Sequence, residues 1–132
     1  MYRCNKKSNW FLRKKLLKLT ADLSHIPPEI WAEYVRCFNE KTIRGSCGDY
    51  RAAATIDCEL DTADLGRKLE MPLLALWGQT SLVGKQFTDP LSIWRERANN
   101  VCGEGLPCGH YVNEEAPEQV TNWLLKFFDG NA

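Results

Sequence analysis

Residues 72–78, PLLALWG, form a continuous apolar run that ends at a glycine. An apolar run without alternating polar residues is typical of a strand buried on both faces, and such strands occur mainly in parallel sheets. We therefore predict a buried parallel strand at residues 72–77. This strand sets the fold class of the chain.

A helix and a second strand follow this run. In the segment DPLSIWRERANN we predict a helix over residues 89–98, with Asp89 as its N-cap and Pro90 at its first position. VCGEGLP predicts a shorter strand around residues 101–106, and APEQVTNWLLKFFDG a closing helix over residues 116–130. The order strand, helix, strand, helix indicates an α/β fold in which the two strands are adjacent and parallel.

The first half of the chain has helical patterns and no further strand of this quality. Each predicted helix has an apolar stripe, a cap or a proline start: residues 9–19, a helix beginning at Pro27–Pro28, residues 49–60, and a short helix within 61–69.

Two parallel strands make a poor sheet by themselves, because such sheets are covered on both faces and paired along both edges. We therefore predict the C-terminal part of a larger α/β fold. Residues 1–60 would be a helical, cap-like portion and residues 61–132 a portion of the core. We expect the open sheet edge to favour self-association of the isolated chain.

Charge and cysteine content narrow the function classes. The 17 basic and 17 acidic residues cancel, so no overall field favours nucleic acid as a partner. Basic residues gather near the N-terminus, and we interpret them as a solvated helix face and not as a membrane anchor. With neither a secretory signal nor a spanning segment predicted, we expect a cytoplasmic location and reduced cysteines. The spacing of Cys102, Cys108 and His110 fits no structural zinc pattern, so no metal or cofactor is predicted.

Several segments together resemble one enzyme family. They are GSCGDYRAAATIDCELDTADLGRKLEMPLLALWG at residues 45–78, IWRERANN at 93–100 and LPCGHYVNEEAPE at 106–118. These segments are similar to the C-terminal half of the haloacetate dehalogenases, which include the fluoroacetate dehalogenases and belong to the α/β-hydrolase superfamily. The resemblance implies a C-terminal fragment of an α/β-hydrolase fold, made of a helical cap segment plus the last two parallel strands and their helices.

The resemblance also implies roles for two residues. His110 is similar to the catalytic histidine of the family, which removes a proton from water after an aspartate has displaced halide from a 2-haloacid and formed an ester. Imidazole suits this role because its ordinary pKa, about 6.5, lies close to working pH. Tyr50 resembles the cap tyrosine that donates its phenol O–H to the leaving halide, where charge develops as the bond breaks. The haloacid is thus the small-molecule partner that the resemblance implies.

Other parts of the family pattern are missing from this sequence. No strand–G-x-D-x-x-G elbow, which would hold the aspartate nucleophile, occurs anywhere. The loop QTSLVGKQF at residues 79–87 holds no carboxylate for a triad, which in the family pattern favours a haloacetate dehalogenase over an epoxide hydrolase. We expect the chain alone to be inactive.

Two alternatives stay open: a non-catalytic remnant that at most binds a partner, and another α/β hydrolase such as an epoxide hydrolase. Outside these roles, His25 is interpreted as a solvated loop residue.

Overall fold

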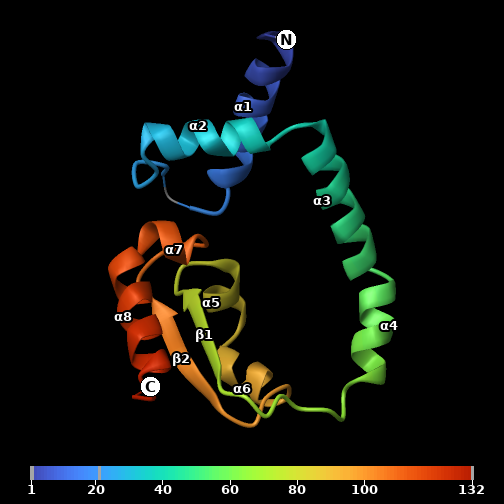
Figure 1. The fold of residues 1–132 in the computed structure, drawn as a ribbon, viewed down its shortest axis with the longest axis vertical. Coiled ribbons are helices and arrows are strands. Elements are labelled where there is room, and N and C mark those ends of the chain that lie inside the picture. The colour runs from blue at the N-terminus through green and yellow to red at the C-terminus, as the bar shows by residue number, and fades with distance from the viewer. Residues whose placement is uncertain (1, 21, 132) are drawn as a thin grey trace. The chain divides into compact units, whose positions relative to one another are not determined.

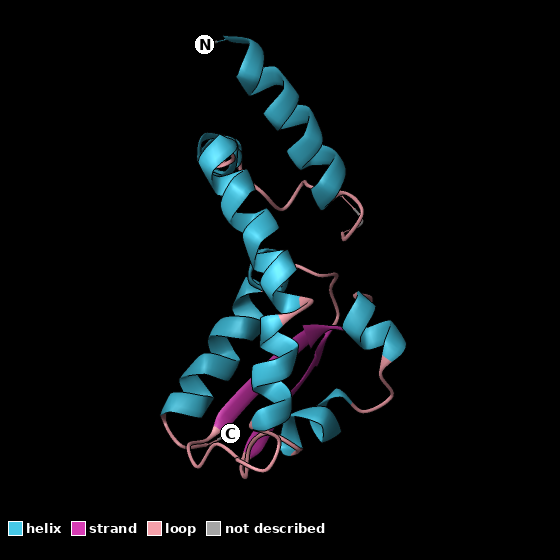
Figure 2. Cartoon of the chain, turned by 90° about the vertical axis from the view of Figure 1, so that its right-hand side faces the viewer, coloured by secondary structure: helices cyan, strands magenta, loops and turns pink. Residues whose placement is uncertain are grey.

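The two predicted strands pair directly with each other. The computed structural model describes residues 2–20 and 22–131. Strand β1, Leu73–Gly78, runs parallel to β2, Val101–Leu106, from the pair Leu73–Val101 to the pair Gly78–Leu106 (Figure 1). Figure 2 shows them side by side in magenta. The prediction of adjacent parallel strands is confirmed.

Two short helices lie between the strands. Helix α5, Leu82–Gln86, begins at Ser81, whose Oγ accepts a hydrogen bond from the N–H of Gly84. Helix α6, Pro90–Arg95, begins at Asp89, whose Oδ1 accepts from the N–H of Ser92 at 3.2 Å. The predicted Asp89 cap is therefore confirmed. The predicted end at Ala98 was wrong by three residues, because the chain leaves the helix to form a parallel bridge between Ala98 and Leu69.

This cap carries a measurable part of the local stability. Asp89→Ala should lower the free energy of unfolding by about 0.5–2 kcal/mol, because the N–H of Ser92 loses its acceptor. Asp89→Asn should cost much less, since asparagine caps as well as aspartate and the Asp89–Arg95 ion pair lies on the surface. Urea unfolding followed by tryptophan fluorescence measures both. Equal losses in the two variants would assign the effect to charge and contradict a capping role.

Helices α7, Val112–Glu115, and α8, Pro117–Phe128, follow β2 and pack on the strand pair. The buried centre consists of Leu106, Cys108 and Ala116. Partly buried side chains surround it, one from β1 and three from α7 and α8: Leu76, Val112, Val120 and Trp123. The indole N–H of Trp123 donates to Glu104 Oε1 at 2.7 Å, which fixes α8 against β2.

The burial of β1 differs from the prediction. Only Ala75 and Gly78 are buried, and the other four residues of the strand are partly exposed. The prediction of burial on both faces was therefore wrong for this chain. The physical reason is the size of the sheet, which has two strands within the described ranges and so leaves strand edges and apolar side chains without cover.

Four helices make up most of the remaining chain. They are α1, Tyr2–Leu16; α2, Pro28–Cys37; α3, Glu40–Ala53; and α4, Ile56–Ala63. The start of α2 at the prolines was predicted correctly. The helix predicted at residues 49–60 was wrong, because the chain breaks at Ala54–Thr55 and two helices share that region. No separate helix begins at Asp61, since α4 continues to Ala63. The helix predicted at residues 9–19 ends earlier, at Leu16.

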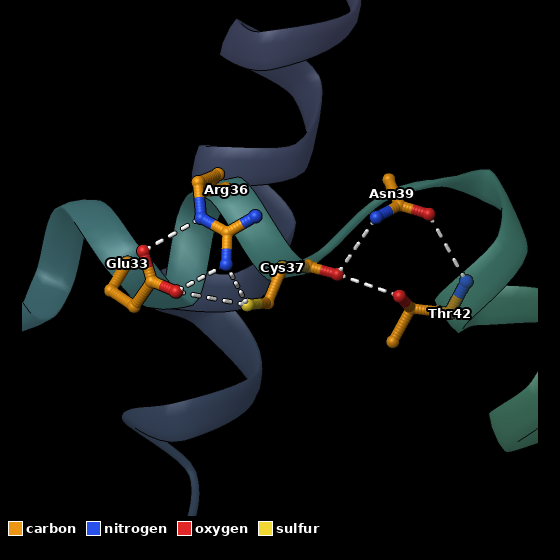
Figure 3. Close-up of polar contacts among 5 residues, drawn as sticks. All are labelled: Glu33, Arg36, Cys37, Asn39 and Thr42. Atoms are coloured by element: carbon orange, nitrogen blue, oxygen red, sulfur yellow. Dashed lines mark hydrogen bonds and ion pairs between the residues drawn. The ribbon is translucent and has the colours of Figure 1, made fainter.

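The connection between α2 and α3 is held by local hydrogen bonds (Figure 3). The carbonyl of Cys37 accepts from Asn39 Nδ2 at 3.2 Å and from Thr42 Oγ1 at 2.7 Å, while Asn39 Oδ1 caps α3 by accepting from the N–H of Thr42. At the end of α2, Arg36 hydrogen bonds to Glu33, and this contact lowers the pKa of the Glu33 carboxyl to about 2. These bonds order the turn locally.

The described residues divide into two compact units. The first takes the chain up to Lys18 and from Ile26 to Gly66, and so holds the four helices α1 to α4. The second takes Leu19–His25 and the chain from Arg67 onward, and so holds both strands. The expected boundary after Leu60 lies inside α4. The assignment of the two portions as cap and core stays a prediction.

Candidate active site

His110 lies in the loop that follows β2, where the sequence placed it. The residue is exposed. Its backbone N–H donates to the carbonyl of Leu19 at 3.1 Å, within the same unit. The imidazole ring packs edge-to-face on the ring of Tyr111, with centroids 5.1 Å apart. No hydrogen bond to the imidazole is found among the described residues, and the unprotonated nitrogen of a neutral imidazole is the one that can accept a proton.

The loop after β1 donates hydrogen bonds to backbone carbonyls of residues 105–108. These residues begin the segment that carries His110, residues 105–111, hereafter the histidine loop. Thr80 donates twice to the carbonyl of Cys108, from its N–H at 3.1 Å and from its Oγ1 at 2.8 Å. Gln79 donates from its N–H to the carbonyl of Leu106 at 2.8 Å and from Nε2 to the carbonyl of Gly105 at 2.8 Å. The chain before His110 is thereby fixed to the end of β1 without using the side chains of the histidine loop.

Close backbone packing accompanies these bonds. A Cβ placed on Gly78 would lie 1.6 Å from the carbonyl oxygen of Gly109. No side chain fits there, so glycine at position 78 is required for the end of β1 to approach the histidine loop.

The carboxylate of Glu115 also binds the histidine loop. Its Oε2 accepts from the N–H of Gly109 at 2.8 Å, and its Oε1 accepts from the N–H of Tyr111 at 3.0 Å. Glu115 is the last residue of α7, so the helix directly after the histidine holds the backbone on both sides of it. Glu115 was not among the site residues predicted from the sequence. The capping-box pattern would not have found it, because that pattern places the glutamate three residues after the cap residue Tyr111, at Glu114.

Tyr50 lies on α3 in the first unit. The residue is 68% exposed, and Lys15 Nζ lies 5.6 Å from the centroid of its ring. The phenol is therefore accessible and has a cation nearby. Tyr50 and His110 belong to different units, and the structure describes each in its own surroundings.

The chain is similar in sequence and in structure to several known proteins. No protein-family model matches the chain. The chain is 37% identical over 101 residues to a fluoroacetate dehalogenase from Burkholderia sp., an alignment that covers 76% of the chain and 33% of that protein. It is 36% identical to a soluble epoxide hydrolase from Corynebacterium sp. (strain C12), over 94% of the chain and 43% of that protein. A crystal structure of an α/β hydrolase from Nostoc sp. PCC 7120 superposes with a TM-score of 0.88 at 44% identity, covering 95% of the chain and 43% of that structure.

In sequence and in fold the chain is similar to members of the α/β-hydrolase superfamily. It spans a third of the length of the dehalogenase and less than half of the epoxide hydrolase. This coverage confirms the predicted fold class, the C-terminal part of an α/β-hydrolase fold with helices and two parallel strands.

The groups around His110 include neither a reactive thiol nor a metal-binding cluster among the described residues. Burial raises the pKa of the Cys108 thiol, and the carboxylate of Glu115 adds to the shift. Cys108 therefore stays a neutral thiol near pH 7 and is a poor nucleophile. β1 is followed by Gln79 and β2 by Pro107, so neither described strand leads into an aspartate. Within the described residues, no group of three or more metal-ligating side chains is present.

The second histidine of the chain corrects one expectation. His25 is only partly exposed, and its Nε2 is buried without a hydrogen-bond partner among the described residues. The prediction of a solvated side chain was therefore wrong. Nearby, hydrogen bonds from Ser24 lower the pKa of Asp22, and the charge of His25 contributes in the same direction.

In the described ranges, no helix has the length and apolar character needed to cross a bilayer.

Proposed function

We propose that this chain carries the water-activating histidine of a hydrolase of the haloacetate dehalogenase type, with His110 as the general base. The exposed imidazole on a loop fixed through backbone bonds is the main support. The 37% identity to a fluoroacetate dehalogenase supports this substrate class. The general base needs a rigid backbone and a free ring nitrogen, and the surroundings of His110 suit both needs.

The proposed reaction has two steps. In the first, an aspartate carboxylate supplied by another part of the enzyme attacks the carbon that bears the halogen. Halide leaves with the bonding electron pair, and an ester forms. In the second, His110 takes a proton from water as the hydroxide adds to the ester carbonyl. The ester bond breaks, a 2-hydroxyacid leaves, the aspartate carboxylate is regenerated, and His110 gives its proton to the solvent. No cofactor takes part in either step.

We further propose that Tyr50 donates its phenol O–H to the departing halide. The exposed ring, with Lys15 beside it, supports this role, because a donor and a nearby cation both favour an anion. The residues up to position 60 would then form part of the cap. We also propose that uncovered apolar side chains and the open sheet edges let the isolated chain associate with itself.

The lone chain should release no halide from fluoroacetate or chloroacetate, because none of its described strands leads into a nucleophilic aspartate. Joining it in one polypeptide to the N-terminal part of the Burkholderia dehalogenase, hereafter the joined enzyme, should restore release. A fluoride electrode measures both. Release by the lone chain that disappears in His110→Ala would reveal a nucleophile within it. A folded joined enzyme without release would overturn the proposed function and favour a non-catalytic remnant.

An epoxide hydrolase is the second candidate, because the match to the Corynebacterium enzyme extends over 94% of the chain. The loop between β1 and α6 has no carboxylate at residues 79–88, which favours the dehalogenase. Epoxide opening assayed on the same joined enzyme separates the two activities. Faster turnover of an epoxide than of any haloacetate would reverse the order of the candidates.

A further inference from the structure

We propose that Glu115 is a positioning residue for His110, holding the backbone on both sides of the histidine so that its imidazole is aimed at the attacking water. The proposal rests on the proposed role of His110. Each carboxylate oxygen of Glu115 accepts one backbone N–H, from Gly109 and from Tyr111. Hydrogen bonds to an ionised carboxylate are roughly twice as strong as neutral ones.

All three successive backbone N–H groups of residues 109–111 are thereby fixed. The N–H of His110 donates to Leu19, and its two neighbours donate to Glu115. Because the backbone cannot turn at any of these positions without losing a bond, the direction in which the histidine side chain leaves the chain is set.

Local packing holds the carboxylate in this position. A Cβ on Gly109 would lie 2.7 and 2.9 Å from the two carboxylate oxygens, so the glycine allows Glu115 to approach this closely. The next residue, Ala116, is 4% exposed and belongs to the buried centre beside β2. Glu115 is therefore directly followed by a residue of the buried centre of its unit.

Both oxygens of Glu115 are used by the backbone, which separates this role from that of a triad acid bound to the imidazole. Losing the contacts should leave His110 present but misaimed. A displacement of about 1 Å at a catalytic group can lower a rate about 100-fold. The effect should fall on ester hydrolysis, where the histidine acts, and not on the first release of halide.

The test uses Glu115→Ala and Glu115→Gln in the joined enzyme, with Glu118→Gln as a control. Glu118 is an exposed carboxylate three residues away, on α8. Glu115→Ala should slow ester hydrolysis per active site about 100-fold. Glu115→Gln should lie between Glu115→Ala and the wild type, because its amide can accept only one of the two N–H groups. The control should match the wild type.

Active sites are counted by the burst of halide in the first turnover. The rate of the burst should be the same in all variants, while the ester accumulates in the Glu115 variants. A merely structural role would reduce the size of the burst and leave the turnover per active site unchanged, and that result would overturn the proposal. Slowing of both steps by the same factor would also overturn it.

Hydrogen–deuterium exchange of the peptide that contains residues 109–111 provides a readout without turnover. Exchange should accelerate in Glu115→Ala and stay unchanged in Glu118→Gln, because only the first change frees the two N–H groups. If the wild-type joined enzyme releases no halide, the proposed function fails, and the exchange result alone decides whether Glu115 fixes the loop. Unchanged exchange in Glu115→Ala would then overturn the contact itself.

Discussion

His110→Ala in the joined enzyme should lower steady-state halide release by about 100- to 10,000-fold, the usual contribution of a general base, while each site still releases one halide. The aspartate performs the first step without the histidine, so the ester forms and then persists because no base activates water. Intact-mass spectrometry after exposure to substrate should show a stable adduct that the wild type does not accumulate.

The second histidine provides the matched control for this prediction. His25→Ala should keep turnover and form no lasting adduct, since no described residue pairs with the Nε2 of His25 and nothing assigns it a step. An inactive but unmodified His110→Ala enzyme would mean that the histidine is needed before the ester forms. That outcome would contradict the proposal that the aspartate forms the ester without His110 and that His110 acts only in ester hydrolysis.

Gly78→Ala should destabilise the second unit by at least about 3 kcal/mol, the upper end of what overpacking usually costs. The new Cβ would lie 1.6 Å from the oxygen and 2.6 Å from the carbonyl carbon of Gly109. Both are backbone atoms, so no rotamer change relieves the clash, and β1 must separate from the histidine loop. The joined enzyme should lose activity together with stability.

Gly45→Ala is the control for an added methyl group. A Cβ at Gly45 would meet nothing within 4 Å, and the residue lies inside α3. That change should stabilise the helix by about 0.5–1 kcal/mol. Thermal unfolding followed by circular dichroism compares the two variants. A Gly78→Ala protein as stable as Gly45→Ala would show that the close approach of Gly78 and Gly109 is absent in solution.

The strand pair was predictable because its signals are local. The apolar run at 72–78 and the Asp89–Pro90 start of α6 each identify one kind of structure. The boundary between α3 and α4 was not predictable in the same way. The break at Ala54–Thr55 has neither glycine nor proline, and α5 is only 5 residues long, too short to show a helical period.

The candidate site was predictable only in part. His110 was found through the flanking motif that resembles a family. Thr80 was missed because it acts on a carbonyl 28 residues away, and no sequence spacing reports such a contact. The partial exposure of β1 was missed for a related reason. The hydrophobicity of a strand shows what it can bury, while the neighbouring elements determine how much of it is covered.

The bonds from Gln79 and Thr80 to the histidine loop also bear on how such an enzyme can be altered. Their acceptors are main-chain carbonyls, which every amino acid supplies, whereas the donor at position 80 needs a hydroxyl. Residues 106–108 can therefore change without removing these anchors, within the limits set by their burial, whereas a Cβ at Gly105 would lie 3.0 Å from Cγ of Gln79. Insertions between β1 and α5 would instead shift the donors and tilt the histidine. An engineer who wishes to retune the direction of His110 without touching it would work on the loop after β1.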